Sequence, residues 1–228
     1  MLGHWRYRRR CHAVVRQCRQ KGVAEHVSEC SDIHVDRLAN TPLIAVDLEM
    51  TGLDARNNRI IAMGWTFIDE GRIRFGTNRH LLINSEQSVG HSAAIHEMTD
   101  SDIASGVSLE AGLEALFDAA RGRVWVFHHA GLDVAFLQQA CTSWAGIEIP
   151  FMVLDTMQME LAMRSRRNLA IPNGELRLGK LRKHYKLPDY TAHNALIDAC
   201  STAELLLAIA GQMDPTSSLR LGSHLNFF

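Results

Sequence analysis

The sequence has few cysteines, no excess charge of either sign and no long apolar run. Its five cysteines are scattered and form no Cys-x-x-Cys pair, so neither a zinc site of that spacing nor a disulfide framework is indicated. Reduced thiols in a cytoplasmic protein are the simplest interpretation. The net charge of −1 excludes a global positive field that would attract a polyanion.

No apolar run approaches the roughly 20 residues that span a bilayer, and the basic N-terminus lacks the continuous apolar segment of an export signal. We therefore expect a soluble protein with no membrane contact. Positive charge is concentrated in two places instead. Residues 5–21 contain seven basic residues and no acid, and residues 164–186 contain eight basic residues and one acid, Glu175.

The chain divides by pattern into three parts. Residues 1–40 form a basic N-terminal extension with helical character, residues 41–213 carry an α/β pattern, and residues 214–228 form a C-terminal tail. Asn-Thr-Pro before Leu43 marks the first boundary. For the extension, a surface helix or a partly disordered arm is the simpler interpretation, and contact with nucleic acid or a membrane surface is the alternative.

The residues after Pro42 alternate between strand and helix patterns. The first strand, 43–49, is followed by two strands that are joined by the tight turn Asp-Glu-Gly-Arg, which favours an antiparallel meander. An amphipathic helix with Ser108 as its N-cap comes next, and short strands then alternate with helices. This order predicts an α/β fold in which helices flank a mixed five-stranded sheet.

The stretch LIAVDLEMTGLD, residues 43–54, ends an apolar strand with two carboxylates. Side chains alternate along a strand, so Asp47 and Glu49 share one face. Like charges this close repel, and burial strengthens the repulsion unless a cation lies between them. From these residues alone, a metal site and acids that are solvated where the strand meets water are both open.

Two more acids lie on helical faces that are otherwise apolar. Asp133 is in the first turn of a predicted helix, where it is either a metal ligand or a cap for backbone N–H groups. Asp198 lies in the second turn of the last predicted helix, within an apolar stripe. Capping is not available that far into a helix, and a buried, unpaired carboxylate is costly, so Asp198 indicates a metal ligand.

One histidine is placed to accompany these acids. His193 precedes Asp198 by five residues, which would put the two side chains about 140° apart on a regular helix. We therefore expect His193 at the helix entry, in a loop that can turn toward the acids. Three other histidines are more simply interpreted as structural or surface groups: His96, His128 and His129.

In order and local context, these residues resemble the active-site motifs of the DEDDh exonucleases. That DnaQ-like group includes the proofreading ε subunit of bacterial DNA polymerase III, and the resemblance covers roughly residues 42–211. The matching residues are Asp47-x-Glu49 after a strand, Asp133 early in a mid-chain helix, and His193-x-Ala195-x-x-Asp198 in a late helix. Ancillary similarity lies in IHEMT at 95–99, LDT at 154–156 and AELLLA at 203–208.

The resemblance implies a ribonuclease H-like exonuclease domain over residues 41–213. It also implies 3′–5′ hydrolysis that releases nucleoside monophosphates with two divalent metal ions. By position, the metal ligands would be Asp47, Glu49, Asp133 and Asp198. Acids and neutral oxygen donors suit Mg²⁺ or Mn²⁺. His193 would be the general base that takes a proton from the attacking water, a role that histidine suits near neutral pH.

The same resemblance suggests where a substrate would lie. Groups near Met50 and Thr51 would meet the terminal 3′-OH, and Leu53 would wedge beside the last base, with ordinary packing of Leu53 as the alternative. The basic run 164–186 would contact phosphates near the mouth of the site or form a solvated helical face.

The nature of the nucleic acid stays open. DLEMTGLD is more similar to oligoribonuclease, whereas HHAGLDVAFL and HNALIDACSTAELLLA are more similar to the ε subunit and ribonuclease T. We expect a substrate with a free 3′ end, single-stranded DNA first. An RNA-directed exoribonuclease of the oligoribonuclease or ribonuclease T kind is one alternative. A module that binds nucleic acid without turnover is another, although all five catalytic positions are present. No clear polymerase-clamp motif is visible, so membership of a replicase is not expected, and the oligomeric state is open.

Overall fold

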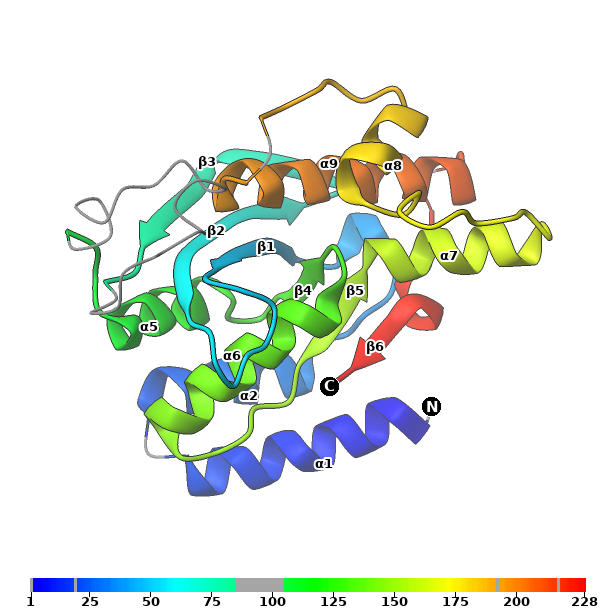
Figure 1. The fold of residues 1–228 in the computed structure, drawn as a ribbon. Coiled ribbons are helices and arrows are strands. Elements are labelled where there is room, and N and C mark those ends of the chain that lie inside the picture. The colour runs from blue at the N-terminus through cyan, green and yellow to red at the C-terminus, as the bar shows by residue number, and fades with distance from the viewer. Residues whose placement is uncertain (1, 19, 85–104, 192, 217) are drawn as a thin grey trace.

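The computed structural model describes residues 2–18, 20–84, 105–191, 193–216 and 218–228 (Figure 1). Its centre is one six-stranded mixed sheet in the spatial order β3-β2-β1-β4-β5-β6. The strands are β1 (Leu43–Met50), β2 (Ile60–Asp69), β3 (Arg72–Leu82), β4 (Val124–Phe127), β5 (Met152–Asp155) and β6 (Leu225–Phe227). The predicted α/β fold with a mixed sheet is confirmed, and the sheet has one strand more than the five expected.

The first three strands form the antiparallel meander that the sequence predicts. β1 pairs with β2, and β2 pairs with β3 across a turn at Glu70 and Gly71. The positive φ angles of these two residues, 54° and 67°, are those of a two-residue hairpin turn. β4 and β5 run parallel to β1 because connections that contain helices return the chain to the same end of the sheet.

The extra strand comes from the segment expected to be a tail. Leu225 and Phe227 of β6 pair antiparallel with Leu154 and Met152 of β5. Just before β6, Leu221 is fully buried. Three residues are too few to show the alternation that marks a strand in a sequence, so the pattern missed β6.

The described part of the chain has seven α-helices. They are α1 (Leu2–Gln17), α2 (Lys21–Asp32), α5 (Leu109–Ala119), α6 (Ala130–Ala145), α7 (Thr156–Arg166), α8 (Leu178–His184) and α9 (Ala195–Met213). α9 lies across β1 and β2 on one face of the sheet, next to α7 and α8 (Figure 1). α5, α6 and α2 cover the other face, and α1 packs on α2 and on β6 (Figure 1).

The core is aromatic on the side of α5 and α2. Trp125 and Phe127 of β4 stack with ring centroids 5.9 Å apart, and Phe117 and Phe151 meet Trp125 at 5.7 and 5.2 Å. His26 of α2 is buried against Phe117 and Trp125, and burial lowers the pKa of its imidazole to about 3. His26 therefore packs as a neutral ring, which makes α2 part of the same core.

α9 is long and apolar enough to cross a membrane by length and composition, the only such helix among the described residues. No such segment is expected from the sequence, because the apolar residues of α9 are interrupted by polar ones. Its stripe of Ala199, Leu205, Leu206 and Ile209 is fully buried and packs against β1 and β2. The spacing of these residues is the one the sequence predicts, so α9 is a core helix here.

Candidate active site

Two carboxylates lie on one face of β1, near its C-terminal end. Asp47 is opposite Gly64 of β2, and Glu49 is opposite Ala62. The pairing with β2 shifts register between Glu49 and Met50, which ends the regular ladder at the site. Glu49 is 6% exposed and Asp47 is half-buried, so neither acid is solvated in the way a strand end in open water would be.

Asp198 of α9 completes a cluster of three acids. One carboxylate oxygen from each of Asp47, Glu49 and Asp198 lies within 4.8 Å of the other two. The donors are all oxygens, and three carboxylates this close repel one another unless a cation compensates them. The residues therefore fit a divalent ion of the Mg²⁺ or Mn²⁺ type.

The start of α9 holds Asp198 in place. The N-cap is Asn194, whose side-chain oxygen accepts hydrogen bonds from the N–H groups of Leu196 and Ile197 at 3.1 and 3.2 Å. Asp198 Oδ2 accepts the backbone N–H of His193 at 2.8 Å. The prediction that Asp198 lies too far into the helix to cap it is wrong, because the helix begins at Ala195 and Asp198 is in its first turn.

His193 lies at the helix entry, as its spacing from Asp198 predicts. Its side chain is exposed, and its backbone has a φ of 69°, in the left-handed region that few residues other than glycine adopt. The hydrogen bond to Asp198 fixes this backbone. The loop therefore carries His193 beside the acid cluster.

A glycine in β2 allows α9 to approach the sheet. A Cβ at Gly64 would lie 2.1 Å from the carbonyl carbon of Ala195. Cross-strand pairs point to the same face, so Gly64 clears the face that Asp47 occupies. The role of Gly64 was not predicted, although a glycine inside a strand pattern is a signal for close approach of another backbone.

Asp133 lies in the first turn of α6 and is 5% exposed. It is outside the group of three acids that lie within 4.8 Å, yet its charge acts on Asp47. Asp155 fixes the start of α6, where Asp133 lies, because its carboxylate accepts the N–H groups of His129 and Ala130. The same carboxylate caps α7 by accepting the N–H of Met157 at 2.9 Å. In the sequence, Asp155 is part of the LDT segment, and its capping role was not predicted. An acid directly before a helical pattern is the signal for an N-cap.

Crowding and burial shift the titration of all four acids. Burial, and then the charges of Asp133, Glu49 and Asp198, raise the pKa of Asp47 well above its ordinary value. Burial and the charge of Asp198 raise the pKa of Glu49 to about 8. Burial also raises the pKa of Asp133 and of Asp198, although hydrogen bonds from backbone groups lower the pKa of both and offset part of the rise. Without a cation, the cluster therefore holds protons that ordinary carboxyls release.

The three predicted substrate contacts follow β1 directly. Met50 is buried at the strand end. The Thr51 hydroxyl donates to Asn58 Oδ1 and accepts the N–H of Arg59, both at 3.1 Å, so it closes the loop of residues 51–59. Leu53 is 81% exposed in this loop, so the alternative of ordinary packing is wrong.

Arg182 connects the His193 loop to α9. Its guanidinium is 4% exposed and donates to the carbonyls of Ser201 and Pro188 and to Glu204 Oε2, at 2.7 to 2.9 Å. It also lies 4.6 Å from the ring centroid of Tyr190, whose hydroxyl donates to the same Glu204. This network anchors the residues that lead to His193. Sequence alone could not reveal it, because Arg182 was one of eight similar cations in its run.

The basic run 164–186 is thus not one uniform surface. Arg182 is buried, and Arg164 pairs with the buried Glu160 at 2.6 Å. Arg177 faces a cavity of about 220 Å³ that His193 and Asp198 also line. Only part of the run can therefore meet a substrate.

Of the three other histidines, His128 has structural partners, His129 is the N-cap residue of α6, and His96 lies outside the described residues. His128 is held by Thr156 Oγ1 at 2.8 Å and the carbonyl of Leu176 at 2.9 Å, and burial lowers its pKa to about 4. This matches the structural role expected of it. His96 and the IHEMT segment at 95–99 fall within residues 85–104, which are outside the described part of the chain.

A family model described as an exonuclease model, RNase_T, matches residues 44–206, well over half of the chain. The chain belongs to this exonuclease family. The resemblance seen in the motifs and the predicted enzyme class, a 3′–5′ exonuclease, are confirmed. The match spans all the acids described above and leaves α1 and α2 outside.

Curated relatives are similar over most of this chain. A PolC-type DNA polymerase III of Thermotoga petrophila is 25% identical over 175 residues, which cover 76% of this chain and 12% of that protein. A 3′-5′ exonuclease DinG of Staphylococcus haemolyticus is 25% identical over 171 residues, 75% of this chain and 18% of that protein. The chain therefore spans less than a fifth of the length of these relatives.

Solved structures show the same fold. Cell-death related nuclease 4 (CRN-4) has a TM-score of 0.65 at 16% identity, over 78% of this chain and 66% of that one. Pop2p of S. pombe has a TM-score of 0.63 at 16% identity, over 81% and 88%. The expected ribonuclease H-like fold is thereby confirmed.

Gly64→Ala should lower activity by separating Asp198 from Asp47, because α9 must move away from β2 to admit a Cβ. Gly76→Ala is the matched control on β3, where an added Cβ meets nothing within 4 Å. Thermal unfolding and exonuclease turnover are to be measured for both variants. We expect Gly64→Ala to lose both stability and activity, and Gly76→Ala to retain both; an active, stable Gly64→Ala would contradict this role.

Glu49→Gln should stabilise the metal-free protein at alkaline pH. Folded Glu49 has a pKa of about 8 against an ordinary value of 4.5, so the folded state keeps a proton that the unfolded chain has released. Wild-type stability is therefore lost as pH rises from about 4.5 to about 8, and the amide lacks this loss. Calorimetry in chelator should show that the melting temperature of the variant rises relative to that of the wild type across this pH window. The expected rise is roughly 2–4 °C for each kcal/mol of difference in the free energy of unfolding.

Glu148→Gln on the exposed surface is the control for this experiment. Its melting temperature should follow that of the wild type at every pH. If the difference in melting temperature between Glu49→Gln and the wild type did not change with pH, the acids would not destabilise one another.

Proposed function

We propose that this chain removes nucleotides one at a time from the 3′ end of single-stranded DNA by metal-dependent phosphodiester hydrolysis. The observation that carries the proposal is the convergence of Asp47, Glu49 and Asp198 within 4.8 Å. The substrate class is supported by proteins of the same fold: an exonuclease I of E. coli was solved with a dT13 oligonucleotide, and exonuclease X with 5′ overhanging duplex DNA. The DinG relative is itself named a 3′-5′ exonuclease.

Two divalent ions, Mg²⁺ or Mn²⁺, are proposed as the cofactors. Asp47, Glu49 and Asp198 would hold them, with Asp133 adding negative charge from α6. When bound, such ions supply Lewis acidity to the phosphodiester and neutralise developing charge. Support comes from the oxygen-only donor set and from Pop2p of S. pombe, a protein of the same fold that was solved in an Mg²⁺- and Mn²⁺-bound form.

His193 is proposed as the general base. The attacking water would give its proton to the imidazole while its oxygen forms the new bond to phosphorus. The bond to the 3′-oxygen of the preceding nucleotide breaks, and this oxygen takes a proton from solvent water to become a 3′-OH. The position of His193 beside Asp198, in an exposed loop that Arg182 anchors, supports this role. An exposed base can exchange its proton with water after each turnover.

The loop of residues 51–59 is proposed to hold the terminal nucleotide. Leu53 is exposed in this loop, and a base is a suitable partner for an exposed apolar side chain. Thr51 closes the loop with two hydrogen bonds and retains one lone pair for a 3′-OH. Met50 would contribute backbone groups at the strand end.

RNA is the second candidate substrate, and the similarity of DLEMTGLD to oligoribonuclease favours it. The sugar preference depends on whether the pocket accepts a 2′-OH.

We also propose that the protein acts in the cytoplasm, because its five cysteines are free.

The test is hydrolysis of 5′-labelled single-stranded DNA and RNA of equal sequence with Mn²⁺ or Mg²⁺. Wild type should give a ladder of one-nucleotide steps from the 3′ end, faster on DNA and absent with chelator. His193→Ala should lower turnover by about 10²- to 10⁴-fold, the range for loss of a general base. Asp198→Asn should abolish the ladder.

Asp189→Asn is the control, because this exposed acid lines the cavity beside His193 but is not in the cluster. It should leave the ladder intact. Oligonucleotides that bind but stay full-length with either metal would instead establish a binding module without turnover.

A further inference from the structure

α1 presents two chemically different faces. Tyr7, Cys11 and Val14 are buried against the rest of the protein. The opposite side is basic: Trp5, Arg9, His12 and Arg16 follow one another at helical spacing and are all exposed. This stripe is about 16 Å long at 1.5 Å per residue. α1 also contains no acid, and it lies outside the exonuclease match at residues 44–206.

The positive charge of this face is mostly uncompensated. Arg8 pairs with Asp32 of α2 at 3.1 Å, and both side chains are well exposed. None of the other four arginines forms an ion pair with a described residue; these are Arg6, Arg9, Arg10 and Arg16. Arg9 lies 4.8 Å from the ring centroid of Trp5, which is 55% exposed. The face thus combines free cations with an aromatic surface.

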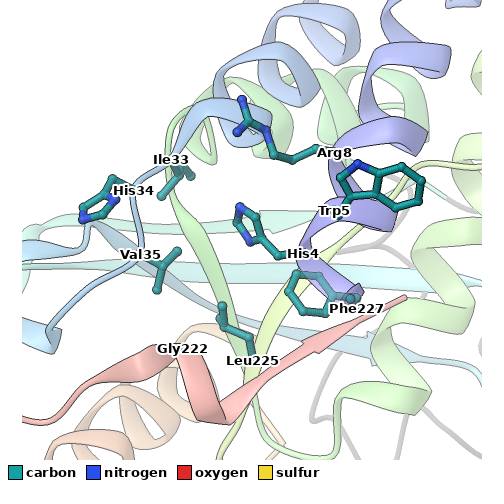
Figure 2. Close-up of a pocket in the computed structure, with 10 residues that line it drawn as sticks. His4, Trp5, Arg8, Ile33, His34, Val35, Gly222, Leu225 and Phe227 are labelled. Carbon is teal, nitrogen blue, oxygen red and sulfur yellow. The ribbon is translucent and has the colours of Figure 1, made fainter. Parts of the chain in front are cut away.

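An open pocket of about 620 Å³ adjoins this face (Figure 2). It lies between the first turns of α1, residues 33–35 and β6, and Figure 2 shows the His4 ring projecting into it. Phe227 and Leu225 provide apolar walls, and the rings of His4 and Phe227 meet edge-on at 6.0 Å. Burial lowers the pKa of His4, and the charge of Arg8 lowers it further.

We propose that the outer face of α1 and this pocket bind single-stranded nucleic acid, with phosphates on the arginines, a base against Trp5 and an unstacked base in the pocket. Arginine neutralises phosphate without regard to sequence, and exposed aromatic rings stack on any base. The ligand class rests on the proposed function. A membrane surface fits less well, because the apolar face of α1 is turned into the protein and cannot enter a bilayer.

The proposed surface is separate from the acid cluster. β6, against which α1 packs, is the edge strand, and β5 and β4 lie between it and β1, so β6 lies about 14 Å from β1 at ordinary strand spacing. A long strand whose 3′ end is in the active site can therefore reach α1 with its trailing part, whereas a dinucleotide cannot. The surface should favour long substrates over short ones.

The experiment is fluorescence anisotropy of labelled oligothymidylate with the full chain, in chelator so that no hydrolysis occurs. The double variant Arg9→Gln, Arg16→Gln should weaken binding and reduce the slope of log affinity against log salt by about 1.4, the value for two phosphate contacts on a single strand. Trp5→Ala should weaken binding roughly 5- to 100-fold. Arg72→Gln on the far edge strand β3 is the control and should change neither quantity.

The pocket has its own variant. A Cβ on Gly222 meets nothing within 4 Å, so Gly222→Phe can fill the pocket without a clash in the core, and Gly222→Ala is its control. We expect weaker binding for the phenylalanine variant only. Hydrolysis of a dinucleotide should be unchanged in all these variants, while hydrolysis of long oligomers becomes less efficient.

Two results would overturn the inference. One is that every α1 variant binds and hydrolyses oligonucleotides as well as the wild type does. The proposed function would be unaffected by this result. The other is co-sedimentation with phosphatidylcholine–phosphatidylserine vesicles that depends on Arg9 and Arg16 while oligonucleotide binding does not. Failure of the proposed function is distinct, because the wild-type chain would then leave every oligonucleotide at full length with either metal, whether or not the α1 variants change binding.

Discussion

Repulsion among Asp47, Glu49 and Asp198 is the interaction on which the rest of the site depends. Three carboxylates lie within 4.8 Å of one another, beside the buried Asp133. Burial, and then the charges of the neighbouring acids, raise the pKa values of Asp47 and Glu49, which opposes the folding of the metal-free chain as pH rises above the ordinary carboxyl range. A divalent cation reverses the sign of this effect, because each acid then faces a positive charge. Stability and function are therefore linked at one place, and the fold holds the acids in an arrangement that is unfavourable until a metal binds.

Holding such an arrangement requires rigid support, which comes from outside the cluster. Gly64 lets α9 approach β2 closely enough to bring Asp198 over β1. Asp155 caps two helices at once and so orients the first turn of α6, where Asp133 lies. Arg182 anchors the loop that precedes His193. Each of these residues acts by position, and none of them belongs to the cluster.

The sequence predicted what depends on local periodicity. The alternation in β1 placed Asp47 and Glu49 on one face, and the stripe in α9 placed Asp198 toward the sheet. Features that depend on contacts between distant segments were not predictable in this way. β6 is too short to show a period, Gly64 has significance only through Ala195, and Arg182 has partners from two other segments. The error at Asp198 arose because the sequence pattern placed the helix start too early; the helix begins at Ala195, which puts Asp198 in its first turn.

The most direct test of this account is the binding of Mn²⁺ to the metal-free protein, measured by isothermal titration calorimetry. The charges of the other three acids all act on Asp47, so we expect saturable binding by the wild type and affinity at least about tenfold weaker in Asp47→Asn. Because folded acids with raised pKa values must release protons, the measured heat should also depend on the ionisation enthalpy of the buffer. Binding that is equally tight in Asp47→Asn, or a wild type that binds no Mn²⁺, would contradict the account.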